Sequence, residues 1–110
     1  MSYQLIIRNR ATQDLRQLAN YILVNGDANA ATRFLELAEA TFAQLATIPG
    51  IGKVVGLVSS RMGEIRQWRV KDFKNYLIFY RIQDNQVEIL RVLHGVMDLE
   101  GILSNLDREI

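Results

Sequence analysis

Residues 65–93 read IRQWRVKDFKNYLIFYRIQDNQVEILRVL, and their pattern indicates a β-sheet. Apolar and aromatic residues recur there with a period of two, which predicts three strands, at Ile65–Lys71, Tyr76–Ile82 and Val87–Leu93. Asp84 and Asn85 separate the last two strands and tolerate positive φ, so a hairpin turn is expected between them. Because strands joined by short turns run antiparallel, the segment predicts an antiparallel sheet.

A helical hairpin is predicted before this sheet. Apolar residues recur at helical spacing from Ala11 to Leu23 and again over Ala28–Ile48. The expected ends of the first helix are an N-cap at Asn9 and the pair Asn25-Gly26, and Asp27 or Asn29 is expected to cap the second. Pro49 and Gly50 stop the second helix, and Asp14 is placed on the polar side of the first.

The remaining segments complete an α+β domain. Tyr3–Arg8 predicts an opening strand that pairs within the sheet, and Ile51–Gly63 predicts a loop with at most one weak strand. Apolar residues at helical spacing predict a short final helix within Asp98–Leu106. Helices gathered on one face of a mostly antiparallel sheet give a two-layer architecture, with residues 1–110 expected to form one domain.

Composition excludes several classes of protein. The chain has 110 residues, 49% of them hydrophobic and 23% charged, which is an ordinary globular balance. It lacks cysteine, so disulfides and thiolate metal sites are excluded, and it lacks an apolar run long enough to span a membrane. A cytoplasmic protein without membrane contact is expected.

Few residues offer catalytic chemistry. His94 is the only histidine, and no carboxylates stand at metal-ligand spacing beside it. Ser59 and Ser60 do not lie in a nucleophile elbow, and Gly50-Ile51-Gly52 fails the dinucleotide-binding pattern. No metal and no cofactor is therefore expected.

Charge gathers in one part of the chain although the net charge is only +1. Seven basic residues stand against two acidic ones between Lys53 and Arg81, a local excess of five. This excess predicts a basic surface for an acidic protein segment or for phosphates, or else a solvated sheet face. Trp68 is either a binding anchor or a core residue. The candidate binding residues are Arg66, Trp68, Arg69, Lys71, Lys74 and Arg81.

Several motifs occur together in a characteristic order. They are Ala11 with Asp14-Leu15, Leu18 and Tyr21; Leu45 with Pro49-x-x-Gly52; Tyr76–Arg81; and Ile89–Gly95 followed by Asp98. In this arrangement the chain resembles the ParE branch of the ParE/RelE superfamily of toxins from type II toxin–antitoxin modules. The resemblance spans nearly the whole chain and implies a helical hairpin packed on an antiparallel sheet.

The two branches of the superfamily imply different mechanisms. RelE-like members cleave mRNA on the ribosome with basic residues, an Arg after the glycine of the last strand and a Tyr near the C-terminus, where this chain has Met97 and Leu103. ParE-like members imply a non-enzymatic inhibitor of DNA gyrase. Met97 also replaces the Arg usual in that branch before the Asp. The resemblance implies that Arg91, His94, Gly95 and Asp98 are the signature residues of the family in this chain.

The resemblance also implies a partner. Toxins of this kind are held by a cognate, ParD-like antitoxin whose acidic C-terminal segment folds on binding, and a heterotetramer is one form of such a complex. A groove on the helical hairpin, a free sheet edge and the basic residues would suit such a segment.

Alternatives stay open for the signature and for the function. Arg91 and Asp98 can form an ion pair that ties the tail to the sheet, His94 can cap the strand end, and the helix dipole alone can explain Asp14. A gyrase-binding toxin is the leading hypothesis. The others are a ribosome-dependent endoribonuclease, using Arg66, Arg69, Lys71 and Arg81 on the scissile phosphate, and a detoxified antitoxin-binding module.

Overall fold

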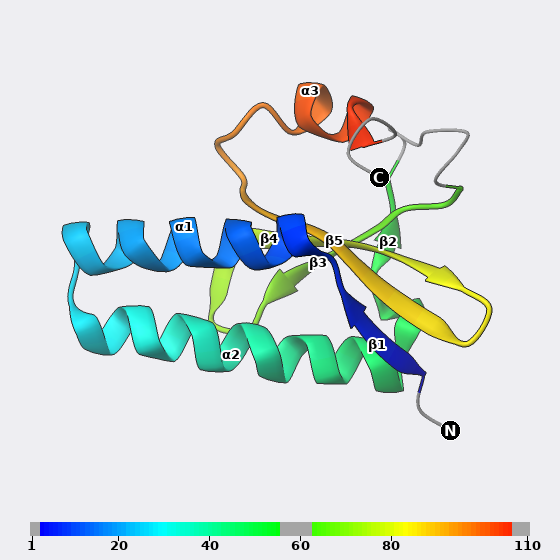
Figure 1. Ribbon diagram of the computed structural model, residues 1–110, viewed down its shortest axis with the longest axis horizontal. Coiled ribbons are helices and arrows are strands. Elements are labelled where there is room, and N and C mark those ends of the chain that lie inside the picture. Colours follow the sequence, from blue (N-terminus) through cyan, green and yellow to red (C-terminus); the bar gives the residue numbers. More distant parts are fainter. Residues whose placement is uncertain (1–2, 56–62, 107–110) are drawn as a thin grey trace.

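A five-stranded sheet carries the helical hairpin on one side in the computed structural model, which describes residues 3–55 and 63–106 (Figure 1). The elements follow one another in the order expected from the sequence. They are β1 (Gln4–Ile7), α1 (Asn9–Asn25), α2 (Ala28–Thr47), the 3₁₀ turn η1 (Pro49–Ile51), β2 (Lys53–Val54), β3 (Arg66–Val70), β4 (Phe73–Gln83), β5 (Gln86–His94) and α3 (Leu99–Ser104).

The sheet has the strand order β1-β5-β4-β3-β2. The last four strands along the chain are antiparallel, as predicted, and the turn at Asp84-Asn85 is confirmed, with Asp84 at a φ of 56°. β1 joins the sheet by pairing parallel to β5, from Gln4 opposite Gln86 to Ile7 opposite Ile89. The weak strand expected in the glycine-rich loop is β2, whereas Gly56, Ser59, Ser60 and Arg61 lie outside the described residues.

The ends of the hairpin helices differ in how they are capped. Asp27 caps α2 as predicted, its Oδ1 accepting from the backbone N of Ala30 at 2.7 Å. The predicted N-cap at Asn9 is wrong, because Asn9 is the first helical residue and Arg8 precedes it without a side-chain cap. The chain enters α1 directly from β1, and the N–H of Arg8 still donates to the carbonyl of Ile89 at 3.0 Å.

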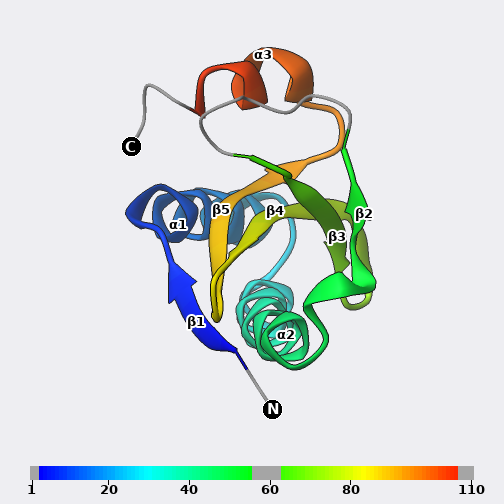
Figure 2. The ribbon, with the colours of Figure 1, turned by 90° about the vertical axis from the view of Figure 1, so that its right-hand side faces the viewer.

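Two apolar cores lie on opposite faces of the sheet. The hairpin buries Phe34, Phe42 and Leu45 against one face, and each fully buried side chain of this size contributes about 1.5–3 kcal/mol. On the other face, Leu103 and Leu106 pack against β4 and β5. Figure 2 shows α3 on the side of the sheet away from the hairpin. The expectation that all helices share one face is therefore wrong for α3. β5 carries apolar side chains on both faces, and its pattern does not specify which face a short helix covers.

Within the described residues, no helix is long and apolar enough to cross a bilayer.

Candidate functional site

A buried ion pair joins α1 to β5 beside the signature residues. The guanidinium of Arg91 donates from Nε to Oδ2 of Asp14 at 2.7 Å and from Nη2 to Oδ1 at 3.0 Å, and both side chains are 5% exposed. The expected pair between Arg91 and Asp98 is wrong: Asp98 caps α3 by accepting from the N–H of Gly101 at 3.1 Å. The bidentate geometry fixes the first helix against the last strand.

Asp14 also accepts a hydrogen bond from β5 at a position where no strand lies beside it. β1 ends opposite Ile89, so the next part of the β5 edge has no neighbouring strand, and Oδ2 of Asp14 accepts from the N–H of Val92 at 3.0 Å. The residue is 4% exposed and lies in the second turn of α1, so both the polar-face placement and the dipole explanation are wrong. Its role is to satisfy a buried cation and a buried N–H together.

His94 shapes the turn that follows β5. Its Nδ1 accepts from the N–H of Val96 at 3.1 Å, and its ring meets the edge of Tyr76 with centroids 4.8 Å apart. The capping role expected for His94 is thus present. Gly95 donates to the carbonyl of Asn75 at 2.8 Å, and a methyl group on it would make only an ordinary contact. Sterics therefore do not explain the glycine of the signature.

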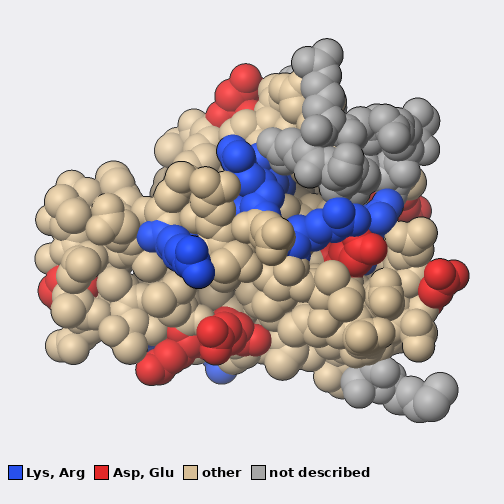
Figure 3. Space-filling view, in the orientation of Figure 1, with Lys and Arg blue, Asp and Glu red and all other residues tan. Residues whose placement is uncertain are grey.

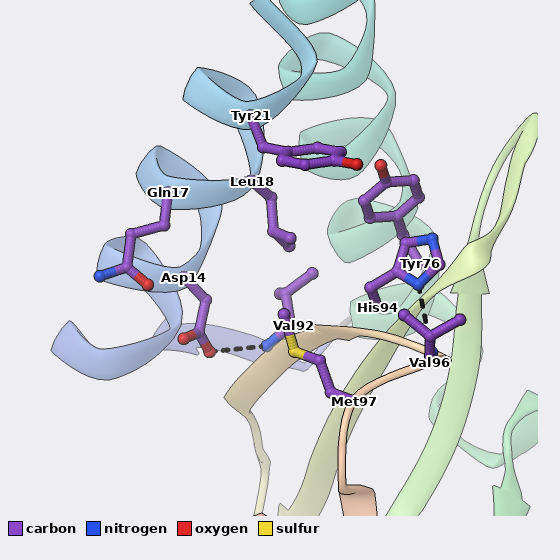
Figure 4. A pocket seen from close by; sticks show the side chains of 9 residues that line it. All are labelled: Asp14, Gln17, Leu18, Tyr21, Tyr76, Val92, His94, Val96 and Met97. Carbon is purple, nitrogen blue, oxygen red and sulfur yellow. Dashed lines mark hydrogen bonds between the residues drawn. The ribbon is translucent and has the colours of Figure 1, made fainter. Parts of the chain in front are cut away.

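A hollow opens between α1 and this turn, and we name it the signature pocket (Figure 4). Its volume is about 300 Å³, and it takes its walls from α1, β4, β5 and the turn after β5. Burial raises the pKa of the Tyr76 hydroxyl, and the neighbouring Tyr21 raises it further, so this hydroxyl stays protonated at neutral pH. The lining residues are Asp14, Gln17, Leu18, Tyr21, Tyr76, Val92, His94, Val96 and Met97.

The side chains that line the signature pocket are mostly apolar or aromatic. No Lys or Arg is among the lining residues, so none of them supplies a cation for a phosphate. The carboxylate in its lining, that of Asp14, is paired with Arg91, and Met97 contributes a thioether. Leu103 is 1% exposed on the other face of the sheet, where it cannot take part.

A basic surface lies around β3, at the far side of β4 from β5. Trp68 and Arg69 line two hollows there, of about 520 and 340 Å³, and the guanidinium of Arg69 lies 5.4 Å from the indole centroid. Trp68 packs partly on the hairpin core and stays partly accessible beside Arg69, so its use as a binding anchor stays a prediction. We define the basic surface by its exposed cations and this ring: Lys53, Trp68, Arg69, Lys71 and Lys74.

Two of the predicted binding residues are held in structural contacts. Arg66 donates to the carbonyl of Gly52 at 2.7 Å and to Glu64 at 3.0 Å. Arg81 donates to Glu88 at 3.0 Å, and its side chain is only 12% exposed. The predicted basic residues are therefore not one continuous set. On the face that Figure 3 shows, basic and acidic side chains are scattered between broad uncharged areas, with acidic ones along α2.

The carboxylate of Glu88 accepts hydrogen bonds from two arginines in a partly buried cluster. Arg81 donates to it at 3.0 Å and Arg8 at 2.9 Å. Burial raises the pKa of its carboxyl, but hydrogen bonds and charge from both arginines outweigh burial, so the pKa lies below its ordinary value. The cluster therefore stabilises the fold fully above the unfolded pKa of about 4.3, and this contribution is lost as the pH falls below it.

Replacing Glu88 by Gln is expected to flatten the acid dependence of stability. Unfolding by urea at pH 7, 5 and 3.5 measures it: the native chain should lose more unfolding free energy over this range than E88Q does. Glu39→Gln, at an exposed position on α2, is the control and should leave the slope unchanged. Equal slopes in native chain and E88Q would contradict the assignment.

Sequence reasoning missed the pocket as a unit. Tyr21 and Tyr76 belong to the family motifs, and Val96 belongs to none of them. The available signal was an apolar residue directly after Gly95 together with an aromatic residue at the edge of the buried stripe of α1. Neither signal shows that the two segments meet.

Comparisons with known proteins agree with this fold. Residues 5–99 match the family described as the ParE toxin of the type II toxin–antitoxin system parDE. A solved chain from the chromosomal ParDE toxin–antitoxin system of P. aeruginosa is similar, with a TM-score of 0.69 over 84% of this chain and 96% of that chain. Its identity is 15%, so this likeness concerns the fold alone. Among curated proteins no match is found.

Proposed function

Because this chain belongs to the ParE toxin family of type II toxin–antitoxin systems, we propose that it arrests growth by binding DNA gyrase without breaking covalent bonds. We further propose that a cognate antitoxin neutralises it through an acidic segment. The family match makes the chain a toxin of this kind of module. The target and the mechanism are the parts that the proposal adds.

One observation carries the non-enzymatic mechanism. The signature pocket, which only His94 of the signature residues lines, has no Lys or Arg in its lining, whereas Met97 stands in its wall and Leu103 is buried elsewhere. Cleavage of RNA needs cations for the phosphate and groups that transfer protons. Of the four residues expected for a ribonuclease, Arg66 and Arg81 are held by carboxylates, whereas Arg69 and Lys71 are exposed. This arrangement supports action by binding.

Induced expression in bacterial cells tests the mechanism. We expect growth arrest, relaxation of a reporter plasmid on chloroquine gels, and intact transcripts in primer extension. Codon-linked cuts in transcripts with normal supercoiling would instead identify a ribosome-dependent endoribonuclease. Normal growth at high expression would identify a detoxified antitoxin-binding module.

The basic surface is the proposed contact for the antitoxin. Lys53, Arg69, Lys71 and Lys74 are exposed around the two hollows, and Trp68 offers apolar area beside them. An acidic segment that folds on binding gains from such charge, which also raises its association rate. Asp72, the acidic residue in the wall of one hollow, is paired with Arg33 at 2.8 Å.

Reversing two charges of this surface is expected to weaken the complex. The double variant K71E/K74E should bind the co-encoded antitoxin about tenfold more weakly in titration calorimetry, with most of the loss at low salt. The control is Arg16→Glu, at an exposed position on α1. An unchanged dissociation constant for K71E/K74E would place the antitoxin on another surface.

A further inference from the structure

The rim of the signature pocket carries strongly exposed apolar side chains. Val96 is 85% exposed, Tyr21 59% and Met97 40%, and all three line the same hollow. Scattered apolar residues are normal on a surface, but a cluster around a pocket marks a contact site for another molecule. The cluster lies beside the Asp14–Arg91 pair, which holds its two main supports, α1 and β5, together.

The pocket also presents polar groups along one side of its apolar wall. Because Nδ1 of His94 accepts a hydrogen bond, we assign its proton to Nε2, which becomes a donor. The hydroxyls of Tyr21 and Tyr76 lie near one another at the same end of the hollow (Figure 4). Within the described residues none of these three atoms has a hydrogen-bond partner.

These features define the group that would fit. About 300 Å³ accommodates one large side chain, and Leu18, Val92 and Met97 favour an apolar one. The donors at the rim suit the backbone carbonyls that flank such a side chain. An acidic segment finds no cation among the lining residues, whereas the basic surface beyond β4 offers several.

We propose that the signature pocket is the surface that grips the target: a gyrase segment inserts one apolar or aromatic side chain between α1 and the turn after β5. This inference rests on the proposed function and adds the contact site to it. The toxin then meets its target and its antitoxin at different places, the pocket and the basic surface.

Inhibition of supercoiling by purified gyrase tests this site. Val96→Asp and Tyr21→Ala change exposed side chains, so both variants should fold, which thermal unfolding checks. We expect at least a tenfold rise in the concentration for half-maximal inhibition, because each change removes apolar contact or adds charge at the rim. Tyr21→Phe, which removes only the hydroxyl, should raise it by a smaller factor.

Ile48→Asp is the matched control. Ile48 is 53% exposed at the end of α2 and does not line the pocket, so this variant should inhibit like the native chain. If the native chain inhibits gyrase and both pocket variants inhibit equally well, the contact site is wrong and the function stands. If the native chain does not inhibit gyrase at all, the function fails and the contact site with it.

Discussion

Replacement of Asp14 by alanine is expected to lower the free energy of unfolding by about 3–5 kcal/mol. The change leaves the Arg91 guanidinium buried without its bidentate partner and removes the acceptor for the N–H of Val92. Removing one member of a buried ion pair costs more than the pair contributes, because the remaining charge stays desolvated. A domain of this size has a total stability of about 5–15 kcal/mol, so D14A loses a large fraction of it.

Denaturant titration of three variants measures the pair. Asp98→Ala removes only the cap of α3 and should cost about 1 kcal/mol. The double variant D14A/R91M should recover part of the unfolding free energy that D14A loses. Methionine at position 91 carries no charge, so no buried charge is left without a partner. If D14A and D98A lost equal stability, the buried pair would not have the role assigned to it.

Replacement of Gly52 by alanine is expected to destabilise the fold by about 3 kcal/mol. The hydroxyl of Tyr80 donates to the carbonyl of Pro49 at 2.6 Å and accepts from the N–H of Gly52 at 2.9 Å, which fixes the exit from α2 onto the sheet. A Cβ on Gly52 would collide with this hydroxyl and would lie 2.8 Å from the carbonyl oxygen of Gln67. Tyr80 is fully buried and cannot move aside.

Gly50 provides the matched control for this variant. It lies two residues earlier in the same turn, and a Cβ there would meet no atom within 4 Å. Gly50→Ala should therefore change the unfolding free energy by less than about 0.5 kcal/mol. Urea midpoints of the two alanine variants compare them directly. Similar midpoints would show that the packing around Tyr80 tolerates a methyl group.

Local patterns predicted the elements because they depend on neighbouring residues. The stripe from Ala11 to Ile22 follows from the spacing within one helix, and the cap at Asp27 and the turn at Asp84-Asn85 act through contacts within a few positions. Leu23, which the pattern also placed on the stripe, is 48% exposed. The pairing of β1 with β5 was expected only as pairing somewhere in the sheet. Its parallel direction depends on how the hairpin crosses the sheet, which the strand sequence alone does not encode.

The site was harder to predict because its contacts join distant segments. Asp14 and Arg91 are 77 positions apart, and the polar character of Asp14 suggested a solvent-facing residue. The local charge excess predicted a basic surface, and Arg69, Lys71 and Lys74 are exposed there, whereas their binding of a partner stays a prediction. It could not show that Glu88 lies opposite Arg81 on the neighbouring strand and neutralises it.

Titration of purified gyrase with the purified chain tests most directly whether this toxin acts by binding. With supercoiling and the integrity of added RNA in a translation extract as readouts, the account predicts inhibition that saturates near stoichiometric amounts while the RNA stays intact. Supercoiling that continues at a large excess of the chain, with RNA cut by substoichiometric amounts, would contradict it.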